Sequence, residues 1–227
     1  RSNIFPAKIG IFHEAGIGDW FLLNPAIKEI KRRSPHTKIY AVVDSILQYF
    51  LETDRNIEGY SLFPDHSVFK KNFRYDEEIF FSSFWGFFRI TRCRQHQINL
   101  ACKVLNIDNC NTKPEICLKQ EDEKFGRSYA KLFKNRMITL YCNSLSRLKD
   151  WDIKCWERVI KECKGYMFVQ IGGNSKNQVK GTLNLIGKTT LAQALIFVKY
   201  SRLFVGVDGL FNHVANIFEI PKVILWG

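Results

Sequence analysis

Short apolar runs alternate with longer segments of helical period along this chain, and this alternation constrains its fold more than any other feature. The runs KIGIF (8–12) and KIYAVV (38–43) have the length and composition of buried strands. Between them, apolar residues keep helical spacing from Trp20 to Arg33, and SILQYFLE follows as another helix candidate. Strands that alternate with helices form parallel sheets covered by helices. The sequence therefore predicts an α/β fold.

The alternation is interrupted in the middle of the chain and begins again with the strand-like run MITLYC. YDEEIFFSSF is predicted to carry a strand and HQINLACKVLNI a helix, and the charged segment KQEDEKFGRSYAKLF is predicted to be a helix that joins two lobes. We therefore predict α/β lobes at residues 1–117 and 136–227, with a connecting helix at 118–135. The chain stops directly after the strand-like KVILWG, whereas parallel sheets are normally covered on both faces. We expect the second lobe to be truncated or unusually minimal.

The charge of the chain points to an anionic partner. Its 227 residues carry a formal net charge of +12, which suits a nucleic acid, a phosphorylated small molecule or an anionic membrane surface. The basic residues are spread in short groups such as 31–33 and 70–71, and no zinc-finger, homeodomain or RNA-recognition motif accompanies them. We therefore expect no nucleic-acid partner.

The cysteines indicate neither a disulfide framework nor a metal site. All seven lie at loose spacing without a CxxC pair, so reduced thiols in a cytosolic protein are expected. Structural zinc sites show tighter ligand pairs, and we predict no metal. No apolar stretch reaches the roughly 18–20 residues that a membrane-spanning helix needs.

Four corners, each after a predicted strand, carry residues suited to binding or catalysis. The first is GIGD, where Gly16 and Gly18 allow close approach of the backbone to a ligand and Asp19 stands at the start of a helix. An ordinary helix N-cap explains the same aspartate equally well. Pro25 is expected in the first turns of this helix, where proline is best tolerated.

The second and third corners follow the first two strands of the second lobe. In CNSLSRLKDW, Ser144 offers a hydroxyl and Lys149 a compact positive charge that suits phosphate. A polar loop with a solvated lysine is the alternative. In QIGGN, Gly172 and Gly173 allow close approach to a flat ring or a phosphate, and a tight turn explains them as well.

The fourth corner is VGVDGLFNH, near the end of the chain. Asp208 can cap the helix that starts at Gly209, the free amides there can hold an anion, and His213 follows one turn later. A histidine on a helix is by itself more often a core or surface residue than a ligand. Ligands of open α/β sheets bind at the carboxyl ends of strands. Because all four corners lie at such ends, we expect them to face one cleft between the lobes.

The order of these motifs resembles glycosyltransferase family 9, the ADP-heptose:lipopolysaccharide heptosyltransferases. That family opens with a strand, a GxGD-type loop and a helix with a Pro-Ala pair, as in KIGIFHEAGIGDWFLLNPAIKEIKRRSP. It continues with a lysine before a W…W helix (KDWDIKCWERVI), a strand ending in GG and a segment like NLIGKTTLAQAL. It closes with D-[ST]-G-x-x-H and P-x-V-x-L-x-G, which residues 204–227 follow closely. The resemblance covers most of the chain, with residues 55–95 aligned only loosely.

The resemblance implies a metal-independent, inverting enzyme of the GT-B fold, in which two Rossmann-like lobes bind the acceptor and the nucleotide sugar respectively. On that pattern Asp19 is the general base of the N-terminal, acceptor-side lobe, and Asp208 contacts sugar hydroxyls or caps its helix. The C-terminal lobe binds the donor. Its remaining implied contacts are Lys149, Ser144, His213 and the amides from Gly209 and Leu210 onward for the diphosphate, and Gly172, Gly173, Thr189 and Thr190 for the nucleotide base.

The family's Ser or Thr followed by Gly is replaced here by Gly209 and Leu210, so a hydroxyl expected at the donor phosphates is missing. The resemblance implies transfer of a heptose-type sugar from ADP-heptose, a co-substrate and not a cofactor, to a lipopolysaccharide-core or related glycan in bacterial-type biosynthesis. The surplus of positive charge suits an anionic, lipid-linked acceptor and peripheral association with the inner face of the cytoplasmic membrane. The alternative is a non-catalytic sugar-nucleotide-binding or assembly protein of the same fold. An NAD-binding Rossmann protein is disfavoured because GxGxxG is absent.

Overall fold

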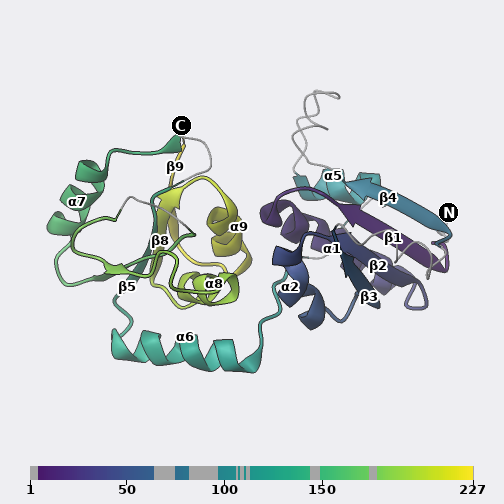
Figure 1. Ribbon diagram of the computed structural model, residues 1–227, viewed down its shortest axis with the longest axis horizontal. Coiled ribbons are helices and arrows are strands. Elements are labelled where there is room, and N and C mark those ends of the chain that lie inside the picture. The colour runs from purple at the N-terminus through teal and green to yellow at the C-terminus, as the bar shows by residue number, and fades with distance from the viewer. Residues whose placement is uncertain are drawn as a thin grey trace. The chain divides into compact units, whose positions relative to one another are not determined.

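The chain folds into two compact α/β units, residues 1–117 and 118–227 (Figure 1). The computed structural model describes residues 5–63, 75–81, 97–105, 107, 110, 113–143, 149–173 and 178–226. Each unit contains one parallel sheet with helices. The predicted α/β fold is therefore confirmed.

The sheet of the first unit has the strand order β3-β2-β1-β4, and every neighbouring pair is parallel. Its strands are β1 (Lys8–His13), β2 (Lys38–Val43), β3 (Gly59–Leu62) and β4 (Glu77–Phe81). From β1 the chain proceeds to β2 and β3 on one side and then returns to β4 on the other. The edge where β1 and β4 end is thus the point at which the strand order reverses, the usual place for a ligand in an open α/β sheet.

The helix after β1 begins earlier than the sequence predicts. α1 spans Ile17–Arg33, with Gly16 as its N-cap residue in an extended conformation (φ −64°, ψ 159°). The predicted start at Trp20 is wrong by one turn, because the apolar period begins only after the first turn. Pro25 consequently lies inside the helix and not in its first turns. The other helices described in this unit are the short 3-10 helix η1 (Ser45–Leu47), α2 (Gln48–Thr53) and α5 (Gln97–Val104).

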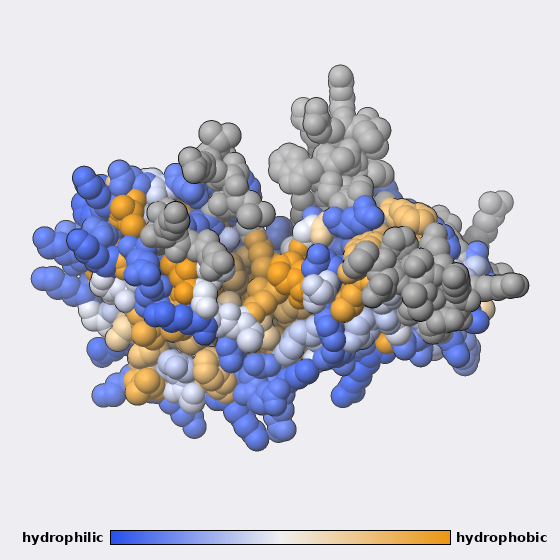
Figure 2. All heavy atoms as spheres, in the orientation of Figure 1, coloured by the Kyte–Doolittle hydropathy of each residue, from blue (hydrophilic) through white to orange (hydrophobic). Residues whose placement is uncertain are grey.

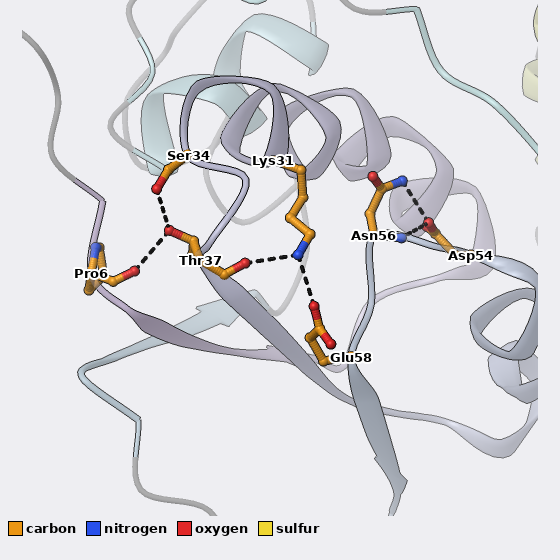
Figure 3. Close-up of polar contacts among 7 residues, drawn as sticks. All are labelled: Pro6, Lys31, Ser34, Thr37, Asp54, Asn56 and Glu58. Carbon is orange, nitrogen blue, oxygen red and sulfur yellow. Dashed lines mark hydrogen bonds and ion pairs between the residues drawn. The ribbon is translucent and has the colours of Figure 1, made fainter.

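A polar network joins the C-terminal end of α1 to the start of β2 (Figure 3). The Lys31 ammonium donates to the Thr37 carbonyl at 2.9 Å and to the Glu58 carboxylate at 3.0 Å. The Thr37 hydroxyl is hydrogen-bonded to the Pro6 carbonyl at 3.0 Å and to the Ser34 hydroxyl at 2.8 Å. Because Thr37 is 1% exposed, these bonds satisfy a buried polar group. They anchor the end of α1 opposite to Asp19.

The sheet of the second unit has the order β7-β6-β5-β8-β9, again with parallel neighbours only. The strands are β5 (Met137–Tyr141), β6 (Met167–Gln170), β7 (Leu183–Asn184), β8 (Leu203–Val207) and β9 (Lys222–Leu225). Here β5 is the central strand, and the order reverses between β5 and β8. The second and fourth corners of the sequence, which follow these two strands, therefore stand on either side of the reversal point.

Helices α6 (Gln120–Leu132), α7 (Ile153–Glu162), α8 (Leu191–Lys199) and α9 (Leu210–Ile217) complete the second unit. The predicted connecting helix, α6, packs on α8. A Cβ atom at Gly126 would lie only 2.1 Å from Ile196 Cγ2 and 2.6 Å from the Tyr200 ring, so glycine permits this close approach. The Glu123 carboxylate pairs with the Lys199 ammonium and accepts from the Tyr200 hydroxyl at 2.5 Å.

The face of the molecule seen in Figure 2 is mostly hydrophilic. Figure 2 shows polar side chains over most of the visible face, with apolar ones among them near the C-terminal end of α6, where Leu132 is 67% exposed. In the part of the chain that the structure describes, no helix is both long enough and apolar enough to span a bilayer.

Candidate functional site

The first corner lies at the C-terminal edge of the first sheet, and its acid belongs to the first turn of α1. The Asp19 amide donates to the Gly16 carbonyl at 3.0 Å, and Gly18 also lies in this turn. The structure does not make Asp19 the N-cap, because Gly16 holds that position. Burial raises the pKa of Asp19 above its ordinary value, and a hydrogen bond with the Gly16 backbone only partly opposes it. A carboxylate of raised pKa is a better proton acceptor near neutral pH than an exposed aspartate.

A hollow of about 510 Å³ opens at the same edge. Its lining residues follow the three strands β1, β2 and β3, and they are Glu14, Ala15, Gly16, Ile17, Asp44, Ile46 and Phe63. Of the predicted site residues only Gly16 is among them. The sequence analysis missed the residues after β2 and β3, although Asp44 directly follows the apolar run KIYAVV and so carries the signal that singled out the other corners.

The second and fourth corners meet at the C-terminal edge of the second sheet. The Lys149 ammonium lies 2.7 Å from Asp208 Oδ2, and both side chains are partly buried. The Asn212 side-chain amide donates to Asp208 Oδ1 at 3.2 Å. Burial alone would raise the pKa of Asp208, but the bonds from Lys149 and Asn212, with the charges of Lys149 and His213, hold it below its ordinary value. Asp208 is therefore an anion at neutral pH.

Lys222 extends this cluster, and the sequence analysis did not single it out. Its ammonium contacts Asn212 Oδ1 and lies 3.4 Å from the Asn212 carbonyl. Burial lowers the pKa of Lys222, while the charge of Asp208 opposes that shift. Asn212 is 5% exposed, and its amide links the two charged groups, since its oxygen faces Lys222 and its nitrogen faces Asp208. Two ammonium groups and one carboxylate leave this cluster with an excess of positive charge.

Helix α9 starts beside this cluster. Gly209 is its N-cap residue without any side-chain cap, and Leu210 is its first residue. The alternative role of Asp208 as a side-chain cap is therefore wrong, because its carboxylate bonds to Lys149 and to the Asn212 side chain. The unpaired amides and the dipole at a helix N-terminus attract anions. A diphosphate held there would lie next to Lys149.

The third corner and the segment after β7 meet at the same edge. The Gly172 carbonyl accepts from the Gly187 amide at 3.0 Å, and Gly172 has φ +151°, a conformation that favours glycine. The Thr190 hydroxyl caps α8 by accepting a hydrogen bond from the Gln193 backbone amide at 3.2 Å. The Thr190 backbone amide in turn donates to Gln193 Oε1 at 3.0 Å.

The structure explains some of the remaining predicted residues and leaves others as predictions. Thr189 has a buried hydroxyl to which the described residues give no hydrogen-bond partner, whereas the Thr190 hydroxyl already has a structural role. Within the described part of the chain, no atom lies within 4 Å of a Cβ atom added at Gly173. Ser144 lies outside the described residues. The contacts predicted for these residues with a nucleotide, and the cleft expected between the lobes, stay predictions.

His13, the last residue of β1, is buried next to the first corner. It is 1% exposed, and its ring packs edge-on against Trp20 with centroids 5.4 Å apart. Burial lowers the pKa of His13 to about 4, although a backbone hydrogen bond partly opposes the shift. The imidazole is therefore neutral in the folded protein at neutral pH.

This burial predicts an acid-sensitive first unit. The unfolded histidine takes up a proton near its ordinary pKa of 6.5, whereas the folded one resists protonation until about 4, so stability is complete above 6.5 and falls as the pH drops. We expect the free energy of unfolding to decrease by about 2 kcal/mol between about pH 7.5 and about pH 5. Urea unfolding at both pH values measures it. The His13→Leu variant should lose this dependence and the exposed control His36→Leu should keep it; the reverse pattern would refute the assignment.

Comparisons with known proteins agree on one family. The sequence model of glycosyltransferase family 9 (heptosyltransferase) matches residues 91–227, which include the whole second sheet. A comparison with curated protein sequences found no match.

Solved structures of similar fold cover nearly the whole chain. A family 9 glycosyl transferase from Veillonella parvula DSM 2008 is 18% identical, with a TM-score of 0.80 over 99% of this chain and 83% of that chain. E. coli ADP-heptose lps heptosyltransferase II is 16% identical, with a TM-score of 0.71 over 96% of this chain and 84% of that one. E. coli heptosyltransferase WaaC with ADP is 13% identical, with a TM-score of 0.68 over 96% and 86%.

At such identities these structures establish the fold alone, and they confirm the predicted GT-B architecture of two units with parallel sheets. The family match covers more than half of the chain. The resemblance read from the sequence is thereby confirmed, and the chain belongs to glycosyltransferase family 9, the heptosyltransferase family.

Proposed function

We propose that this protein transfers a heptose-type sugar from an ADP-linked donor to a lipopolysaccharide-core or related glycan, with inversion and without a metal. The observation that carries the proposal is the cationic cluster beside the start of α9. Among the described residues Lys149 donates only to Asp208, which leaves two of its three N–H donors for a diphosphate. Charge-assisted bonds from an ammonium and from helix amides are the interactions that stabilise a departing diphosphate.

Asp19 is the general base in this proposal. Its carboxylate takes the proton of the acceptor hydroxyl as the hydroxyl oxygen forms a bond with the anomeric carbon. The bond between that carbon and the donor phosphate breaks, and the nucleoside diphosphate leaves with the electron pair. The raised pKa of Asp19 supports this role, because a proton acceptor works best when its pKa approaches the pH of the reaction.

The hollow beside Gly16 is the proposed place of the acceptor. Among the described residues, its lining includes the carboxylates of Glu14 and Asp44 and neither lysine nor arginine. Carboxylates accept hydrogen bonds from sugar hydroxyls and repel phosphate. We therefore propose that this hollow holds a neutral, hydroxyl-rich part of the acceptor, and that any phosphate or lipid of the acceptor lies outside it. The surplus of positive charge suits such an anionic lipid-linked molecule at the cytoplasmic face of a membrane.

One departure favours a second function, a sugar-nucleotide-binding or assembly protein without catalysis. Gly209 stands where the resemblance predicts a serine or threonine, so one expected donor hydroxyl is absent. Binding without transfer would follow if that hydroxyl were needed in the transition state and nothing replaced it.

A transfer assay separates the two functions. The purified protein is incubated with a panel of nucleotide sugars and a lipopolysaccharide-core acceptor, and the masses of the products are measured by mass spectrometry. We expect a product heavier by one heptose with the ADP-linked donor only. Tight ADP binding without any product would support the non-catalytic alternative. Transfer from a donor with another nucleotide would refute the proposed donor.

A further inference from the structure

Tyr141, the last residue of the central strand β5, lies with its phenol end between two of the predicted donor corners. A Cβ atom on Gly209 would lie 3.7 Å from Tyr141 Cε1, and a Cβ atom on Gly172 would lie 3.7 Å from Tyr141 Cε2. The two ε carbons flank the carbon that carries the hydroxyl. One edge of the ring therefore faces the segment after β6 and the other edge faces the segment after β8, near the end that carries the hydroxyl.

The neighbours of Tyr141 hold the ring in this place. The Phe211 ring on α9 packs against it at a steep angle of 62°, with centroids 4.8 Å apart. Gly206 pairs with Tyr141 across the sheet, and because a Cβ atom there would lie only 3.1 Å from Tyr141 Cβ, the glycine leaves room for the base of the Tyr141 side chain. A ring packed against an aromatic partner and close to the backbone of its neighbours loses little further freedom when a ligand binds.

The Tyr141 ring lies beside the start of α9, because its Cε1 atom is close to the N-cap residue Gly209. Gly209 immediately precedes α9, and Asp208, the partner of Lys149, precedes Gly209. Among the described residues none is hydrogen-bonded to the Tyr141 hydroxyl. Burial, with the charge of Asp150, raises the pKa of Tyr141. The hydroxyl thus keeps its proton at neutral pH and can donate it to an anion.

We propose that the Tyr141 hydroxyl donates a hydrogen bond to a phosphate oxygen of the nucleoside diphosphate and replaces the hydroxyl that Gly209 lacks. This inference rests on the proposed donor site. It also accounts for the glycine, since the side chain from the neighbouring strand supplies the group that the helix start does not. A serine at position 209 fits beside the ring, because its Cβ atom would make an ordinary contact at 3.7 Å.

The test is calorimetric titration of the whole protein with ADP and with adenosine. Tyr141→Phe removes the hydroxyl and keeps the ring, and we expect ADP binding to weaken by about three- to tenfold, the scale of one hydrogen bond, with adenosine binding unchanged. Adding Gly209→Ser to Tyr141→Phe should restore ADP binding to within about twofold of the wild type. Tyr166→Phe is the matched control, because Tyr166 is 44% exposed and directly precedes β6 at the opposite edge of the sheet.

The outcomes separate this inference from the function on which it rests. Wild-type ADP affinity in Tyr141→Phe, with weakened binding in Lys149→Ala, would overturn the role of Tyr141 and leave the donor site intact. Equal losses for ADP and adenosine would overturn the phosphate contact. A wild-type protein that binds no ADP would instead refute the proposed donor. Failure of Gly209→Ser to rescue binding would show that the two hydroxyls are not equivalent and would also overturn the inference.

Discussion

We expect the Asp19→Asn variant to transfer sugar about two to four orders of magnitude more slowly than the wild type, the usual loss when a general base is removed. Asparagine keeps the shape of the side chain and one of its oxygens but cannot take up the acceptor proton. The affinity for ADP should be unchanged, because Asp19 belongs to the first unit and the proposed diphosphate contacts belong to the second. Single-turnover rates and ADP titration measure the two quantities separately.

The same variant has an expected effect on stability. Because burial raises the pKa of Asp19, the ionised side chain disfavours the folded state, and stability falls as the pH rises from the ordinary value of 3.8 through the raised one. Asp19→Asn carries no such charge. It should therefore be at least as stable as the wild type at neutral pH, as measured by urea unfolding. A slow variant that is also strongly destabilised would indicate a structural role for the carboxylate.

Asp44→Asn is the matched control for Asp19→Asn, since Asp44 is another carboxylate at the same edge. Its Oδ1 accepts from the Ile46 amide at 2.9 Å, and asparagine can keep that bond. We expect Asp44→Asn to retain most of the turnover at saturating acceptor, with any loss confined to acceptor affinity, because Asp44 lines the proposed acceptor hollow and is not the proposed base. If Asp44→Asn lost turnover by orders of magnitude and Asp19→Asn did not, the base would be Asp44 and the assignment made here would be wrong.

Lys149→Ala should weaken ADP binding by about 1.5–3 kcal/mol, the scale of a charge-assisted hydrogen bond. That corresponds to a rise in Kd of about ten- to 150-fold. Two causes contribute. The ammonium no longer contacts the diphosphate, and the Asp208 carboxylate loses the partner that lies 2.7 Å away and so repels the ligand.

A double-mutant cycle with Asp208→Asn separates these two causes. Because both causes contribute, we expect Lys149→Ala/Asp208→Asn to recover only part of the binding that Lys149→Ala loses, the rest being the direct contact of Lys149 with phosphate. If Lys149 acts only by neutralising Asp208, the second change restores binding. Lys164→Ala is the control for loss of one positive charge, because Lys164 is exposed and lies in the turn between α7 and β6. ADP affinity that is equal in the wild type and in Lys149→Ala would refute the proposed donor site.

The sequence was sufficient for the elements with strong local patterns. The central strands β1, β2, β5, β6 and β8 are apolar runs, and the helices between them have a clear 3.6-residue period, so both could be predicted without any knowledge of their neighbours. The edge strands β3 and β7 were missed. Their residues are only half buried, and their extended conformation depends on pairing with the adjacent strand, which leaves little local signal.

The sequence also indicated which corners are candidates for binding and catalysis, and through the order of its motifs it determined the family. The corners can be recognised from the sequence because the carboxyl ends of parallel strands lie at one edge of a sheet, where ligands usually bind. Only the tertiary structure decided which residues meet there. Lys149 and Asp208 are 59 residues apart, and they pair because β5 and β8 are neighbours, an order that no local pattern encodes. The linkage through Asn212 to Lys222 and the place of the Tyr141 ring between two glycines follow in the same way from strand order and packing, which are long-range properties of the folded chain.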